Sequence, residues 1–144
     1  MISKNLYLAV IALLIVTGVH AQETAKFDST NLKVSKILFK YFHPRAASKD
    51  NPVQDTVVVQ FKIDSNKKIT DASILRSLDP EHDAEVLNIF KTCDQTIPLN
   101  PAEYTVAVRF VVRNGKPSDS PKLLDQKLYK NFLFEITALT KFTD

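Results

Sequence analysis

Histidine, cysteine and acidic side chains are the groups in this chain that could do chemistry, and they are few. The chain has three histidines and a single cysteine, Cys93. A cysteine beside a histidine would form a nucleophile with its general base. His43 and His82 lie far from Cys93 in the sequence, and no nucleophile motif surrounds the cysteine. A hydrolase would therefore require Cys93 to meet His43 or His82 in the fold, whereas a lone cysteine near a helix end is more often buried and inert.

Metal and cofactor chemistry finds equally little support. His82 stands between Glu81 and Asp83, but the three lack metal-ligand spacing, and acids there suit the positive end of a helix. Gly18 and Gly115 are the only glycines, so a glycine-rich phosphate loop is excluded. The net charge of +3 is too small to indicate nucleic acid, and no aromatic platform accompanies the basic strand positions. We expect no enzyme activity, no cofactor, no metal and no nucleic-acid partner.

The N-terminus is typical of an exported protein. Lys4 precedes an apolar run from Leu6 to Val16, and Val19-His20-Ala21 is a small-residue cleavage site. Residues 1–21 are therefore predicted to be a signal peptide cut after Ala21, which would place the protein in the periplasm or outside the cell. The alternative is an uncleaved inner-membrane anchor, although the run is shorter than the roughly 17–25 residues that span a bilayer. The remaining length of about 120 residues suits one domain, and with one cysteine it has no internal disulfide.

Three segments are predicted to be helical. Residues 31–43 carry apolar side chains at helical spacing after Ser29 or Thr30 as cap, and Pro44 ends them. Residues 80–93 follow Asp79 as cap, with Pro80 at the first helical position, although Asp83 could equally cap a slightly later start. Residues 121–142 follow Ser120 as cap, with one apolar stripe and further apolar residues left over. The stripe comprises Leu124, Leu128, Phe132, Ile136 and Leu139; the residues left over are Leu133, Phe134 and Phe142.

Three segments are predicted to be strands. Residues 56–64 and 104–113 alternate apolar and polar side chains with period two, and residues 69–77 do so if a bulge lies near Thr70-Asp71. The tight turn between the first two favours an antiparallel pair, with Asn66 best suited to a positive φ. The predicted fold class is α+β: a small antiparallel sheet of about three strands, helices on one face, and an extra C-terminal helix.

A small open sheet leaves strand edges whose N–H and C=O groups can pair with an extended peptide. The opposite interpretation is that the charged side chains of Arg109 and Arg113 only protect the edge of the last strand against pairing with another chain. The residues alone leave both open.

A succession of elements between Tyr41 and Val112 resembles the C-terminal domain of the TonB family of energy transducers. Pro44 and Ala47 match its P-x-x-A element, Val57 to Asp64 its first strand, Thr70-Asp71 its T-D pair and Asp83 its helix-starting aspartate. Tyr104 to Val112 match its last strand. The chain departs from the family pattern at three points: Asp55 replaces a glycine, the turn lacks one, and Ile97-Pro98 replaces an aromatic-proline pair. Only about ten residues separate Ala21 from the first helix, roughly 30 Å extended, so we do not expect a full periplasm-spanning transducer.

The resemblance implies a periplasmic interaction module, residues 22–113, that binds an extended peptide of an outer-membrane receptor or transport partner by strand addition. The implied contacts lie along the last strand. They are Tyr104, Thr105, Val106, Ala107, Val108, Arg109, Phe110 and Val111. Residues 114–144 form a helical extension that we expect to cover part of the sheet or its edge, or to support a homodimer. The alternative function is a structural or envelope-assembly protein with the same fold and a closed edge.

Overall fold

The computed structural model describes residues 28–45, 54–112 and 124–140. The predicted signal peptide with its cleavage site, Ala47 and Gly115 lie outside these ranges, as does the predicted start of the C-terminal helix at Ser120. Within the described ranges no helix combines the length and hydropathy needed to cross a membrane.

Two α-helices are described, and side-chain caps begin both of them. α2 (Ser29–Phe39) is capped by Asp28, whose Oδ1 accepts from the Thr30 N–H at 3.0 Å, so the expected caps Ser29 and Thr30 lie one and two residues too late. α3 (Pro80–Thr92) is capped by Asp79, which accepts from the His82 N–H at 2.8 Å, with Pro80 at the first helical position. The prediction of Asp79 as cap is confirmed.

The sheet contains four strands in the order β2-β1-β3-β4. β1 (Thr56–Ile63) pairs antiparallel with β2 (Ile69–Arg76) and with β3 (Ala102–Val112), whereas β4 (Phe132–Thr140) runs parallel to β3. The α+β class is confirmed, but the sheet is mixed and has one strand more than expected.

The β1–β2 hairpin has the predicted bulge. Lys62 pairs with Asp71 and Ile63 with Ile69, which leaves Thr70 as the extra residue. A second register shift leaves Leu75 extra near the other end of β2. In the turn Lys67, not Asn66, takes the positive φ, at 63°. The Asp64 carboxylate accepts from the backbone N–H groups of Asn66 and Lys68, which holds the turn without a glycine.

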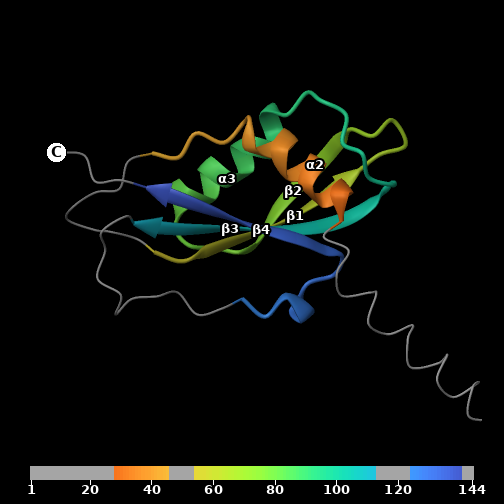
Figure 1. The fold of residues 1–144 in the computed structure, drawn as a ribbon. Helices are drawn as coiled ribbons and strands as arrows, with labels where there is room; N and C mark the ends of the chain where they lie inside the picture. Colours follow the sequence, from red (N-terminus) through yellow and green to blue (C-terminus); the bar gives the residue numbers. More distant parts are fainter. Residues whose placement is uncertain (1–27, 46–53, 113–123, 141–144) are drawn as a thin grey trace, which may run out of the picture.

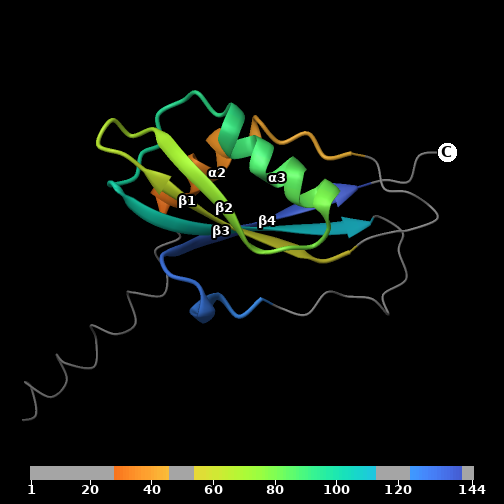
Figure 2. The same ribbon diagram turned by 180° about the vertical axis from the view of Figure 1, so that it is seen from behind.

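Both helices lie on one face of the sheet, as Figures 1 and 2 show from opposite sides, and the core fills the space between. The alternating residues of β1 and β3 supply the sheet side of this core, as their period-two pattern predicts. From the helices come Val34, Leu38, Val86, Ile89 and Phe90; from the sheet come Val57, Val59, Phe61, Ile63, Val106, Val108, Phe110 and Ala138.

The predicted C-terminal helix is wrong over residues 124–140. A short 3-10 turn, η2 (Gln126–Leu128), leads instead into β4, and Asn131 turns the chain with φ of 49°. Phe132, Phe134, Ile136 and Ala138 alternate with period two, and β-branched and aromatic residues favour a strand. In the structure Leu128 and Leu139, two members of the proposed helical stripe, are largely exposed. Residues 132–140 thus belong to the sheet of the domain and not to a helical extension.

We expect Asp79→Ala to lower the free energy of unfolding by about 1 kcal/mol, the usual effect of losing a helix cap. Burial alone raises the pKa of Asp79, but hydrogen bonds from the backbone and ring of His82 outweigh it and hold that pKa below its ordinary value. The stabilisation is therefore complete above the ordinary carboxyl pKa of about 3.9 and is lost as the pH falls through the lower folded pKa.

Urea unfolding at neutral pH and in steps below pH 4 measures this difference. The control is Glu81→Ala, because Glu81 lies exposed in the same helical turn and caps nothing in the described contacts. Equal losses for the two variants, or an Asp79→Ala deficit that persists unchanged in acid, would contradict the capping role.

Candidate functional site

The edge of β3, where the sequence placed the partner peptide, is occupied by β4. Thr105 pairs with Phe132 and the register continues to Val112 opposite Thr140. On the other side β3 pairs with β1 from Ala102 to Arg109. The eight predicted contact residues, Tyr104 to Val111, therefore lie on an interior strand. An added strand has no access to β3 while β4 is in place.

Polar contacts at both ends hold β4 against β3. At its start the Thr105 N–H donates to the Asn131 carbonyl at 3.1 Å, and Thr105 Oγ1 donates to the Lys130 carbonyl at 2.8 Å. The Asn131 side chain donates to the Glu103 carbonyl at 2.8 Å. Near the end of the strand Thr140 Oγ1 donates to the Val111 carbonyl. Local sequence patterns gave no signal for these contacts, since each joins residues 25 or more positions apart.

An ion pair fixes the middle of β4. Arg109 Nη2 lies 2.8 Å from Glu135 Oε1, and both side chains are mostly buried, with 20% and 18% of their surfaces exposed. The sequence suggests Arg109 as a charge that protects an open edge. In the structure Arg109 instead pairs with Glu135 of β4, the strand that closes that edge.

On this side of the sheet β4 is the outermost of the described strands, and no other described strand pairs with its outer edge. The Thr105 N–H faces β4 while the Phe110 N–H faces β1 and donates to Asp55, so odd residues of β3 present their peptide groups to β4. In a parallel pair the backbone N–H and C=O groups of the even residues of β4 then point toward β3. Those of the odd residues Glu135, Thr137 and Leu139 point away from it, toward the outer edge. Asn31 Nδ2 donates to the Leu133 carbonyl at 3.0 Å, which agrees with this direction.

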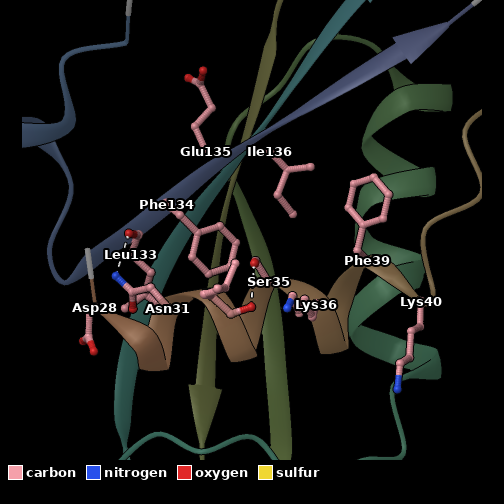
Figure 3. A pocket seen from close by; sticks show the side chains of 11 residues that line it. Asp28, Asn31, Ser35, Lys36, Phe39, Lys40, Leu133, Phe134, Glu135 and Ile136 are labelled. Atoms are coloured by element: carbon pink, nitrogen blue, oxygen red, sulfur yellow. Dashed lines mark hydrogen bonds between the residues drawn. The ribbon is translucent and has the colours of Figure 1, made fainter. Parts of the chain in front are cut away.

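A groove lies along this edge, between α2 and β4, and has a volume of 630 Å³. Figure 3 shows Phe134, Ile136 and Phe39 among the side chains that line it, with Asp28 at one end and Lys40 at the other. We call this surface the α2/β4 groove. Its remaining lining residues are Asn31, Leu32, Ser35, Lys36, Leu133 and Glu135. Apolar side chains beside a free strand edge are what an extended peptide needs, because alternate side chains of the peptide can enter the groove.

The two outer edges of the sheet differ in their protection against pairing. β2 contains two bulges as well as Asp71 and Arg76, features that discourage an added strand. β4 has its one irregularity at its start, no proline and no lysine, and its one charge, Glu135, is neutralised by Arg109. The β4 edge is therefore the better site for strand addition.

The candidate catalytic residues do not converge. His82 lies in the first turn of α3 and Cys93 follows its last residue, so about 16 Å of helix, at 1.5 Å per residue, separates them. Burial raises the pKa of the Cys93 thiol, which disfavours the thiolate needed for attack. His82 Nδ1 lies 2.7 Å from Asp79 Oδ2, with its ring edge-on to Phe110. His43 lines a separate cleft of 480 Å³ with Arg45 and Glu85. Within the described ranges no group of three potential ligands could hold a metal.

We expect Glu135→Gln to lower the free energy of unfolding by about 1–3 kcal/mol, because Arg109 would keep a largely buried charge with a weaker partner. Urea unfolding measures this loss, and amide hydrogen exchange should show it mainly in β4. The control is Asp71→Asn, since Asp71 pairs with Lys62 at 4.0 Å in an exposed position and should contribute little. Similar losses for both variants would show that the Arg109–Glu135 pair does not hold β4.

Comparison of the chain with protein-family models, with curated proteins and with solved structures finds no match in any of the three. Function therefore has to be argued from the edge of β4 and the groove beside it.

Proposed function

We propose that this chain is a protein-interaction module that binds an extended segment of another protein by strand addition along the outer edge of β4. The observation that carries the proposal is the α2/β4 groove, an apolar surface that lies directly beside a strand edge with which none of the described strands pairs. Main-chain hydrogen bonds would hold the segment, and its alternate side chains would enter the groove. That the partner is an outer-membrane receptor or transport component is what the TonB resemblance implies.

The chemistry of the groove describes the segment that fits. Phe134 and Ile136 form its floor on β4, and Leu32 and Phe39 its wall on α2. A segment with apolar residues at every second position would therefore bury one face there. Lys36 and Lys40 at the far end of the groove favour an acidic residue in the segment at that end.

A structural or envelope-assembly role is the second candidate, and the closure of the β3 edge by β4 favours it. A protein whose sheet is completed by its own last strand needs no partner at that position. The two functions differ in whether the outer edge of β4 takes up a peptide, which a binding experiment can decide.

The test is an amide NMR titration of the chain with short peptides of alternating apolar and polar residues and one acidic residue. Shifts should concentrate on Leu133 to Leu139 and on α2. Thr137→Pro should abolish them, because it removes an outward N–H without touching the ladder to β3. The matched control Thr137→Ala keeps that N–H and should bind as the parent does.

Three results would contradict strand addition at β4. Absence of shifts with any such peptide favours the structural role. Equal binding by Thr137→Pro and Thr137→Ala would show that the β4 edge is not used. Shifts on Tyr104 to Val111 accompanied by lost protection of β4 would mean that the peptide replaces β4 on β3.

A further inference from the structure

We infer that, in the absence of another partner, the α2/β4 groove is occupied by the same groove of a second copy of this chain, which forms a two-fold dimer. The inference concerns regulation of the site proposed above and rests on that site being the β4 edge. In the dimer the two β4 strands pair antiparallel, the two sheets become one, and the two α2 helices lie side by side over the junction.

The exposed apolar residues of α2 suit such a partner. Leu32 and Phe39 have 42% and 50% of their surfaces exposed, and both line the groove together with apolar residues of β4. They are seven residues apart, so they lie on one side of the helix, two turns from each other. A second α2 antiparallel to the first would present the same two residues in return and cover both pairs.

The charges along the groove are arranged to match an antiparallel copy. α2 begins close to the start of β4, with Asp28 beside Leu133, and the two elements diverge toward Lys36 and Lys40 near the end of the helix (Figure 3). A two-fold axis through the junction reverses this order in the second copy. Each Asp28 then faces the lysine end of the other groove, and the same contact occurs twice by symmetry.

The strand edge allows this pairing without a charge clash. In an antiparallel pair of β4 strands, residues whose peptide groups point to the outer edge lie opposite each other. The register is therefore fixed by the residue through which the two-fold axis passes. A centre on Glu135 would place two carboxylates opposite each other, which is destabilising. A centre on Ile136 places Glu135 opposite Thr137 of the second copy, and we assign the dimer this register.

Sedimentation of the full chain from micromolar to millimolar concentration tests the dimer. A monomer–dimer equilibrium is expected. Lys40→Glu sets like charges opposite each other and should raise the dimer Kd about tenfold or more. Adding Asp28→Asn, which keeps a capping side chain, removes the repulsion and should recover most of the affinity. Lys33→Glu is the matched control, since Lys33 is exposed on α2 but does not line the groove, and it should leave the Kd unchanged.

A chain that stays monomeric at every concentration would overturn this inference, and so would a dimer that responds equally to Lys33→Glu and Lys40→Glu. A dimer unaffected by Thr137→Pro would also overturn it, because the two strands could not then be paired. Peptide titration of the dilute monomer separates this outcome from the function proposed above. Peptide binding without dimers defeats only the dimer, whereas dimers that show the expected variant pattern but bind no peptide defeat only the peptide function.

Discussion

The parallel ladder between β3 and β4 turns a sheet that would end at β3 into one that ends beside a helix. Without β4 the last strand would present Tyr104 to Val111 to solvent along one edge. With β4 in place that edge is closed, the Arg109–Glu135 pair is shielded, and the outermost described strand on this side is one that lines a groove with α2. The position of the groove and the direction of the outward peptide groups of β4 both follow from this one pairing.

Local patterns were sufficient to predict β1, β2, α3 and β3, whereas the cap of α2 was placed one or two residues too late. Asp79 and Pro80 mark the start of α3, and the odd residues of β1 and even residues of β3 mark the buried face, because each signal lies within one element. A bulge near Thr70-Asp71 was predicted because the apolar residues of β2 change phase there, and Thr70 is the extra residue. The positive φ fell on Lys67 instead of Asn66, since the Asp64 carboxylate binds the N–H groups on either side of Lys67.

The last segment was misread because its apolar residues satisfy two periods at once. Phe132, Ile136 and Leu139 fit a helical stripe, while Phe132, Phe134 and Ile136 fit a strand. The surplus of apolar residues in the helical interpretation was the signal that the period was wrong. The candidate site depends on this segment, because the groove needs both α2 and β4. Contacts such as Arg109 with Glu135 and Asn31 with Leu133 join positions that no local pattern connects.

Hydrogen bonds alone do not make the β4 edge a binding site. Glu135, Thr137 and Leu139 each present one N–H and one C=O outward, and a net gain of about 1 kcal/mol per bond only matches the lower range of the roughly 4–15 kcal/mol that association costs. Any stable occupant must therefore also bury apolar surface, which the groove between α2 and β4 supplies at this edge. An extended segment that makes only main-chain hydrogen bonds to β4 would bind only transiently. Stable binding requires a strand that also places side chains in the groove, or a partner whose own helix packs against Leu32 and Phe39.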